Sequence, residues 1–347
     1  MNITWQLARG MPAFNKGGAM GIVDGAPVYA AGCTFPWRET EQGWDWDQAR
    51  GDWFPVEPAL VLGRGYTHGI TLHDGLLVLG GRKSTPEGRL SLRDGWWLRR
   101  RNGQFTWTPL PEMNYPRAIP TIGVADNKVL ALGGGEWERS VGGAFATRHL
   151  THYELLDLDN LAAGWQVMGA LPFPSQVGSA FASVGNSLYL FGGYECWTDA
   201  NVRQLHRGST AWSYDFARNT WSQLADFPCA ATGWCAVPFQ QQIVLLGGAL
   251  HFQAQGAAAI TNTFHTLESG TSRQRLIGAY SDQVFVYDIT ENRYYSLVER
   301  MPIGLNDLRA TIFGNTIYAA GGETVDPALS NCSNAFMIGT IEGRGGE

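Results

Sequence analysis

The sequence predicts an all-β protein built from six similar units that close on themselves. Composition agrees with many tight turns and large packing anchors, because the 347 residues include 44 glycines and 14 tryptophans. No Pro/Ser-rich linker divides the chain, which favours one closed array over two separate domains. The main observation is a repeat in which an aromatic residue is followed, 26 or 27 positions later, by a glycine that ends an apolar run. The six pairs are Trp5 and Gly32, Trp53 and Gly80, Trp107 and Gly133, Trp165 and Gly192, Trp221 and Gly247, and Tyr294 and Gly321.

Each unit predicts four short strands. Residues 64–81 contain an extended stretch, the two-residue turn signal Asp74-Gly75 and an apolar run at 76–79, which together predict two antiparallel strands joined tightly. A more polar stretch then ends at a second turn, such as residues 215–220, and predicts a third and a fourth strand. Continuous apolar runs such as VLALGG, LYLFGG and IVLLGG are typical of strands buried on both faces. The glycines after them allow the backbone to turn where a side chain would clash.

The apolar runs that end in a glycine doublet at 129–134 and 188–193 resemble kelch repeats, as does Tyr214-Asp215 followed by Trp221. The resemblance covers essentially the whole chain and implies a six-bladed kelch β-propeller with four strands in each blade. The chain departs from the pattern in the first doublet, Gly32-Cys33, in the last aromatic residue, Tyr294, and in an insertion from 249 to 282.

Closure of the ring follows from the two ends of the pattern. The strand at 3–7 precedes the first doublet, whereas the strand at 335–338 follows the last doublet with no fourth strand behind it. We expect the N-terminal strand to complete the last blade and so to remove an open sheet edge. Residues 1–341 then form a single propeller. Residues 342–347 are interpreted as a tail, because 341–344 (IEGR) match a protease-cleavage linker.

Composition argues against several partners and compartments. The net charge is -6, and the basic residues are scattered except at Arg99-Arg100-Arg101, beside the turn signal Asn102-Gly103, so no nucleic-acid partner is expected. Five cysteines without a CxxC pair favour a reducing compartment over a disulfide framework. The start MNITWQLARG is not a secretory signal, and no apolar run approaches about 18 residues, so no membrane partner is expected. The sequence as it stands predicts a cytoplasmic protein, and a periplasmic or secreted one if a leader was removed.

The innermost strands of a propeller line its axis, so the loops that lead into them meet the loops after the glycine doublets at one mouth. Alignment of the units on their glycines places charged residues and aromatic rings there. Before and on the inner strands these are Arg64, Arg117, His68, Thr121, Ala180, Cys235 and Arg309, and on the doublet loops Arg82, Lys83, Glu136, Arg139, Glu195, Asp199 and Glu323. The aromatic residues are Tyr66, Trp137, Tyr194 and Trp197.

These residue types predict a site for a small polar ligand. Arginines bind carboxylates bidentately, neighbouring glutamates perform acid/base chemistry, and aromatic faces stack on sugar rings. The candidate ligand-binding residues are Arg64, Tyr66, His68, Arg82, Arg117, Glu136, Arg309 and Glu323. An alternative stays open, in which Arg64, Arg117 and Arg309 pair with carboxylates inside the channel, because buried charges require partners. For His68 a simple hydrogen bond within the channel is favoured over a functional role.

No metal or other cofactor is expected. The histidines show no metal-ligand spacing except His149-x-x-His152, which lies outside the predicted mouth. Nothing resembles a nucleophile elbow or a phosphate-binding loop. A copper radical oxidase of the galactose oxidase kind shares kelch blades, but it needs a tyrosine, histidine and cysteine constellation that these positions do not supply.

Among kelch propellers, the chain is similar to the N-acetylneuraminate epimerases, or sialic acid mutarotases, in its six blades, its long insertion before the last blade and the last doublet Gly321-Gly322-Glu323-Thr324. The resemblance implies an isomerase that binds a sugar acid, with Glu195 and Arg203 as the catalytic residues. The extra Tyr194 and a longer interval between the two residues depart from the family's pattern. The alternative is a non-catalytic kelch module that binds a protein partner through the same mouth, since fold alone does not decide function.

Overall fold

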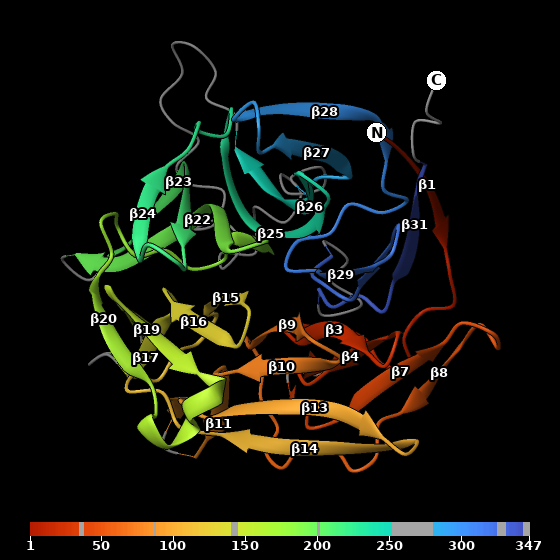
Figure 1. The fold of residues 1–347 in the computed structure, drawn as a ribbon, viewed down its shortest axis with the longest axis horizontal. Helices are drawn as coiled ribbons and strands as arrows, with labels where there is room; N and C mark the ends of the chain where they lie inside the picture. Colours follow the sequence, from red (N-terminus) through yellow and green to blue (C-terminus); the bar gives the residue numbers. More distant parts are fainter. Residues whose placement is uncertain are drawn as a thin grey trace.

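The computed structural model describes residues 1–34, 38–86, 88–139, 145–199, 202–251, 280–324 and 331–342. Over these ranges the chain is nearly all β-structure, with one short 3-10 helix, η1 (Leu158–Ala163), among the described residues. Six four-stranded antiparallel sheets are arranged around a central axis (Figure 1). The all-β prediction is confirmed.

In each sheet the strands follow one another from the axis outwards, and the last sheet ends on the N-terminal strand. The first sheet contains β3 (Ala19–Val23), β4 (Ala26–Ala30), β7 (Gly43–Asp47) and β8 (Asp52–Pro55), and the second contains β9 (His68–Leu72), β10 (Gly75–Leu79), β13 (Gly95–Arg101) and β14 (Gln104–Leu110). The third contains β15 (Thr121–Ala125), β16 (Lys128–Leu132), β19 (His152–Asp157) and β20 (Gln166–Ala170), and the fourth contains β21 (Ala180–Val184), β22 (Ser187–Asp199), β23 (Val202–Asp215) and β24 (Thr220–Gln223). The fifth contains β25 (Ala230–Phe239), β26 (Gln242–His251), β27 (Gln283–Asp288) and β28 (Arg293–Arg300), and the last contains β29 (Arg309–Phe313), β30 (Thr316–Ala320), β31 (Phe336–Glu342) and β1 (Asn2–Leu7).

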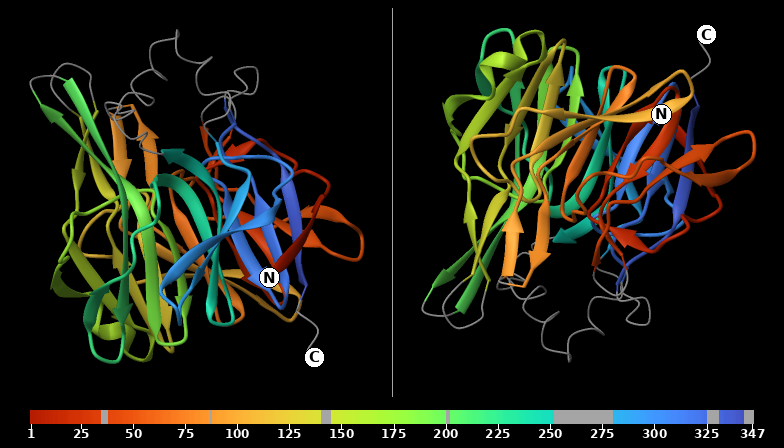
Figure 2. Two further views of the ribbon diagram at one scale, coloured as in Figure 1. Left: turned by 90° about the horizontal axis from the view of Figure 1, so that it is seen from above. Right: turned by 90° about the horizontal axis from the view of Figure 1, so that it is seen from below.

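Three smaller sheets lie where the glycine doublets end. They are β11 (Arg82–Thr85) with β12 (Gly88–Ser91), β17 (Gly135–Arg139) with β18 (Phe145–His149), and β2 (Asn15–Lys16) with β5 (Cys33–Thr34) and β6 (Arg38–Glu39). The hairpin β11–β12 and the long ends of β22 and β23 project from the same side of the molecule (Figure 2).

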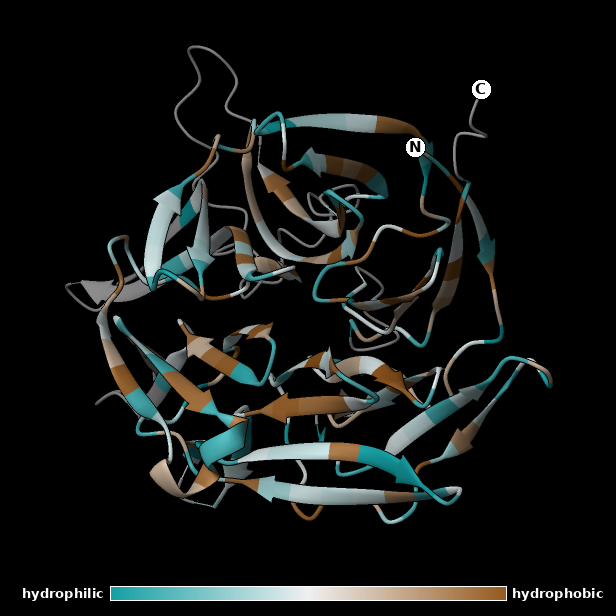
Figure 3. Ribbon diagram, in the orientation of Figure 1, coloured by the Kyte–Doolittle hydropathy of each residue, from teal (hydrophilic) through white to brown (hydrophobic). Residues whose placement is uncertain are grey.

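The second strand of each sheet is buried on both faces, as its apolar run predicts. In β10, Leu76 and Val78 pack towards the preceding sheet, whereas Leu77 and Leu79 pack towards the following one. Because side chains alternate along a strand, a continuous apolar run fills two cores at once. β10 is accordingly hydrophobic along its length, whereas the outer strands β13 and β14 are mixed (Figure 3).

The ring closes through a core between the last sheet and the first. Here Trp46 and Trp53 of the first sheet pack edge-on against Phe336 of β31, with both ring centroids 4.7 Å from that of the phenylalanine. The other cores join each sheet to the next in chain order. Burial of aromatic and aliphatic side chains between sheets is therefore continuous around the axis.

The N-terminal strand completes the last sheet, as the sequence predicts. β1 pairs with β31 in an antiparallel register in which Ile3 lies opposite Ile341. Both isoleucines are 1% exposed. β31 is longer than expected from the sequence, because Ile341 and Glu342 of the linker-like segment take part in the ladder. Residues 343–347 of the expected tail, and 252–279 of the insertion, lie outside the described residues.

Candidate functional site

The mouth of the channel is built from equivalent short segments of the sheets. The residues that lead into the inner strands form isolated bridges with the residues that follow the glycine doublets. Examples are Gly65 with Arg82, Val177 with Tyr194, and Asn306 with Glu323. The alignment on glycines therefore predicted correctly that these two sets of segments meet.

In every sheet, one residue near the start of the inner strand has a left-handed backbone conformation. In most sheets this residue lies two positions before the inner strand. Three sheets have glycine there, at Gly17, Gly178 and Gly233. The others have Tyr66 with φ 51°, Ile119 with φ 55° and Asp307 with φ 52°. A side chain in this conformation costs about 1 kcal/mol or more, and such residues concentrate at functional sites. Tyr66 and Asp307 therefore mark the part of the mouth between the last, first and second sheets.

Lys16 and Glu323 form a buried ion pair in this part of the mouth. Lys16 lies on β2 with its side chain 2% exposed, and its Nζ donates to Glu323 Oε1. The other oxygen of Glu323 accepts from Asn306 Nδ2 at 2.9 Å and from the Tyr280 hydroxyl at 3.3 Å. Burial alone would lower the pKa of Lys16, but the charge of Glu323 raises it above its usual range. Lys16 is thus a fixed cation and Glu323 a carboxylate held by several donors.

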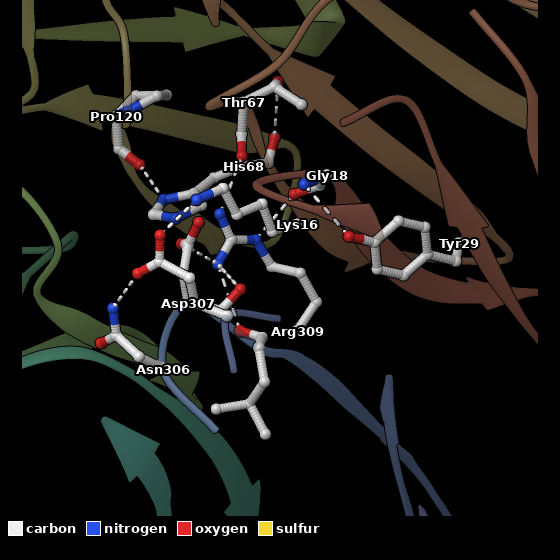
Figure 4. Close-up of polar contacts among 11 residues, drawn as sticks. Lys16, Gly18, Tyr29, Thr67, His68, Pro120, Asn306, Asp307 and Arg309 are labelled. Atoms are coloured by element: carbon white, nitrogen blue, oxygen red, sulfur yellow. Dashed lines mark hydrogen bonds and ion pairs between the residues drawn. The ribbon is translucent and has the colours of Figure 1, made fainter. Parts of the chain in front are cut away.

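Asp307 and Arg309 form a second pair beside the first (Figure 4). Arg309 Nη1 donates to Asp307 Oδ1 at 2.8 Å, Nε donates to the Gly18 carbonyl at 2.6 Å, and Nη2 donates to the Thr67 carbonyl at 3.3 Å. Burial raises the pKa of Asp307, the nearby charge of Glu323 adds to this, and Arg309 opposes it. Asp307 therefore keeps its proton to a higher pH than an ordinary aspartate does.

Arginines on the small sheet β11–β12 complete this side of the mouth. The guanidinium of Arg82 lies 4.2 Å from the centre of the Tyr66 ring and 4.0 Å from a Glu39 oxygen. Burial raises the pKa of Tyr66 to about 12, so its hydroxyl stays protonated. Burial and the like charge of Arg82 lower the pKa of Arg89. Positive charge is therefore concentrated here, which favours an anionic ligand.

His68 is held by a hydrogen bond in the channel. Its Nδ1 lies 2.5 Å from the Pro120 carbonyl oxygen (Figure 4). The centre of its ring is 5.2 Å from that of the Phe181 ring. Burial and the charge of Arg309 lower the pKa of His68 well below its usual value. The favoured sequence interpretation, a hydrogen-bonded histidine on a channel strand, describes this geometry.

The alternative interpretation, in which the arginines pair with carboxylates, describes Arg309 with Asp307 and also Arg64 and Arg117. Arg64 binds Asp94 through two hydrogen bonds of 2.8 and 2.7 Å, and Arg117 binds Glu154 with its closest contact at 2.9 Å. Both arginine side chains are 0% exposed. Each also donates to the carbonyl of the first glycine of its doublet, Gly80 or Gly133. Their expected place at the ligand site is therefore corrected, because at this repeat position the side chain turns into the sheet and fastens the doublet.

Glu195 and Arg203, the catalytic residues implied by the resemblance to the epimerases, lie on the long hairpin of β22 and β23. Glu195 is partly exposed and pairs across the ladder with position 206, whereas position 203 pairs with position 198. Positions 195 and 203 therefore belong to alternate faces of this hairpin. The side chain of Arg203 is outside the described residues, as are those of Trp137, Arg139, Trp197 and Asp199. Glu136 is partly exposed on β17. The catalytic roles of Glu195 and Arg203 stay a prediction.

Several residues of the mouth were missed by the sequence reasoning, namely Lys16, Asn306, Asp307 and Tyr280. The same alignment on glycines contained a signal for one of them. It places Asp307 opposite Gly17, Gly178 and Gly233, so a charged residue stands where half of the repeats need glycine. Tyr280 lies near the end of the insertion, and nothing in its local sequence marks it. Among the described residues, no group of three or more histidines, cysteines and acidic residues is placed to hold a metal ion.

The ring of sheets, the glycine doublets and the likenesses below define the class of protein as a kelch-type β-propeller. No family model matches the sequence. The chain is 27% identical to the Kelch-like protein terF of Aspergillus terreus (strain NIH 2624 / FGSC A1156) over 267 residues, which is 71% of this chain and 52% of that protein. It is also similar to the N-acetylneuraminate epimerases of Yersinia pestis (strain Pestoides F) and Yersinia pseudotuberculosis serotype O:1b (strain IP 31758), with 28% identity over 179 residues, 47% of this chain and 44% of each relative.

The chain thus spans about half the length of the curated relatives it matches. The solved structure of YjhT matches with a TM-score of 0.66 and 16% identity, over 95% of this chain and 96% of that one. At this identity the likeness concerns the fold alone. In the described part of the chain, none of the helical structure has the length and apolar character needed to cross a membrane.

Proposed function

We propose that residues 1–341 form one six-bladed kelch propeller and that its mouth binds a small sugar acid and interconverts its anomers. The observation that carries this proposal is the pairing of Lys16 with Glu323 and of Arg309 with Asp307, in a mouth where Arg82 lies against the Tyr66 ring. Cations of this kind bind the carboxylate of a sugar acid. The names of the epimerase relatives support the choice of substrate class.

The chemistry requires one proton acceptor and one proton donor near the anomeric centre. Ring opening removes a proton from the anomeric hydroxyl and delivers one to the ring oxygen, and closure reverses both transfers. Asp307, whose pKa is raised by burial and by Glu323, supplies the donor, and a neighbouring carboxylate supplies the acceptor. Glu323 occupies that position in the mouth. Glu195 of the β22–β23 hairpin is the acceptor implied by the epimerase resemblance.

The test combines binding with turnover. A sugar acid such as N-acetylneuraminate raises the melting temperature of the wild-type protein by mass action, whereas a neutral sugar does not. Anomer exchange is then followed by NMR in the wild type and in Asp307→Asn, Glu323→Gln, Glu195→Ala and Arg203→Ala. Asparagine tolerates the left-handed backbone at 307, so that variant tests the carboxyl group rather than the fold. Loss of exchange of about a hundredfold identifies the acid and the base.

Glu291→Gln is the matched control, because Glu291 lies on the surface turn between β27 and β28. It should keep both the thermal shift and the exchange rate. If a folded sample shows no shift with any sugar acid, the proposal fails, and a non-catalytic module that binds a protein partner becomes the better interpretation.

A further inference from the structure

A cavity of about 200 Å³ lies in the channel between the inner strands. Apolar side chains dominate its wall, among them Phe181, Val124 and Ile312. An apolar cavity of about 150 Å³ is large enough to hold a benzene molecule. The volume therefore suits a molecule with one six-membered ring rather than a single water.

Polar groups in the wall of this cavity bind one another or other groups of the protein. Thr71 Oγ1 and Thr311 Oγ1, from two sheets that are not neighbours in the ring, lie 3.2 Å apart. Towards the mouth, the guanidinium of Arg309 is occupied by Asp307 and by two backbone carbonyls. These polar groups are thus satisfied within the protein, and a ligand must match the rest of the wall instead.

His68 presents a hydrogen-bond acceptor in this wall. A carbonyl oxygen only accepts hydrogen bonds, so the short contact with Pro120 O requires that His68 Nδ1 carries the proton. Burial and Arg309 keep the ring neutral, since they lower its pKa well below the usual value. Nε2 then carries a lone pair, on a residue that lines the cavity beside the Phe181 ring. The thiol of Cys235 lines the same cavity, and burial raises its pKa to about 12, so it is uncharged too.

We propose that this cavity is a second binding site, for a small neutral hydroxylated aromatic molecule of which phenol is the simplest. The phenol hydroxyl donates to His68 Nε2, and its ring packs against Phe181 and the aliphatic wall. The site differs in chemistry from the charged mouth, since His68 is a neutral acceptor, most of the wall is apolar, and Arg309 at its edge is already paired with Asp307. It does not depend on the sugar-acid proposal.

The experiment measures binding of phenol, toluene and benzoate to the full chain by calorimetry. Phenol binds more tightly than toluene, because only phenol donates to His68, and benzoate is excluded. In His68→Phe, which keeps an aromatic ring but has no acceptor, phenol affinity falls about three- to tenfold and toluene affinity is unchanged. Glu195→Ala, on the hairpin, leaves phenol binding unaltered.

A measurement on the wild-type protein guards against poor folding of His68→Phe. With ¹⁵N-labelled histidine, phenol shifts the Nε2 resonance of one histidine that already has the Nδ1–H tautomer, whereas toluene does not. Equal affinity for phenol and toluene, unchanged phenol affinity in a folded His68→Phe, or no binding of either would each overturn the proposal. Tighter binding of benzoate, lost in Arg82→Gln, would assign the ligand to the mouth instead.

Discussion

At the scale of single residues, the same amino acid has different roles at different repeat positions. Arg64 and Arg117 are fully buried and fasten glycine doublets, whereas Arg309 lines the channel and pairs with Asp307. Asp307 itself has a left-handed backbone where other sheets use glycine. Position in the repeat, more than residue type, therefore decides whether a charged side chain is enclosed in a sheet or lines the channel.

Removal of Arg117 tests the structural role of a buried pair. Arg117→Met leaves the carboxylate of Glu154 without its cation, and both side chains are 0% exposed. We expect a loss of about 3–5 kcal/mol in the free energy of unfolding. Arg93→Met is the control, because Arg93 and Glu112 form an ion pair with both side chains 56% exposed, which contributes about 1 kcal/mol or less. Urea unfolding measures both variants, and equal losses would contradict the assigned role.

The pair of Asp94 with Arg64 predicts a pH dependence of stability. Burial would raise the pKa of Asp94, but the bonds from Arg64 outweigh it and lower the pKa below its usual value. Because the folded pKa lies below the unfolded one, the contribution is complete above the unfolded pKa of about 4 and is lost as the pH falls through the folded pKa. Asp94→Asn should therefore be less stable than the wild type at pH 6 but lose less stability on acidification.

Melting temperatures of the wild type and Asp94→Asn, recorded from about pH 6 to about pH 2.5, check the expected pH dependence. Asp126→Asn is the control, since Asp126 is exposed on the turn between β15 and β16, and it should follow the wild-type curve. Parallel curves for the wild type and Asp94→Asn would show that the pair does not contribute.

At the scale of the strands and turns, the glycine doublets place the mouth relative to the sheets. Each doublet follows a strand buried on both faces, and in several sheets the segment after it bridges to the segment that leads into the inner strand of the same sheet. At Gly80, φ is 56° and an added Cβ would lie 2.2 Å from the Arg117 carbonyl oxygen. The doublet glycine is required both by its backbone conformation and by the close approach of the next sheet.

Two glycine substitutions separate these requirements. Gly80→Ala adds a clash to a strained backbone, whereas Gly103→Ala has φ 77° with nothing within 4 Å of the added Cβ. We expect Gly103→Ala to cost about 1–2 kcal/mol from backbone strain alone. Gly80→Ala should cost about 1–3 kcal/mol more, because the backbone must shift to accept the methyl group. Denaturant unfolding checks this, and similar costs for the two would mean that packing at the doublet is loose.

At the scale of the whole molecule, stability depends on closing the ring. β1 covers the edge of β31, and Trp46, Trp53 and Phe336 fill the core between the last and first sheets. An uncovered edge strand would offer unpaired backbone groups to other chains. The two ends of the chain therefore act as one sheet, although more than 300 residues of sequence separate them.

Deletion of residues 1–7 tests this closure. It removes the ladder partner of β31 and the buried Ile3 side chain. The loss should exceed about 2 kcal/mol, since burial of one isoleucine alone contributes about 1.5–3 kcal/mol. We also expect concentration-dependent association, measured by light scattering together with thermal unfolding. Removal of residues 343–347 is the control and should leave both unchanged. A monomeric deletion variant with wild-type stability would show that β1 is dispensable.

The sequence by itself determined the all-β class, the six repeats and the N-terminal strand that completes the last sheet. Short segments of sequence indicate these features through apolar runs, turn signals and glycines at fixed spacing. They can therefore be predicted without knowing which segments come into contact. The sequence also located the mouth, and it placed Arg82, His68, Arg309 and Glu323 near it. It did not decide which of the charges pair with one another.

That decision belongs to the tertiary structure. The direction in which the Arg64 side chain leaves the backbone decides that it pairs with Asp94. Closure of the ring brings Lys16 to Glu323, although more than 300 residues of sequence separate them. The burial that fixes the pKa of Asp307 and the tautomer of His68 likewise arises only when inner strands of several sheets come together. Chemistry at the mouth is set by contacts between distant segments, and local sequence carries no record of them.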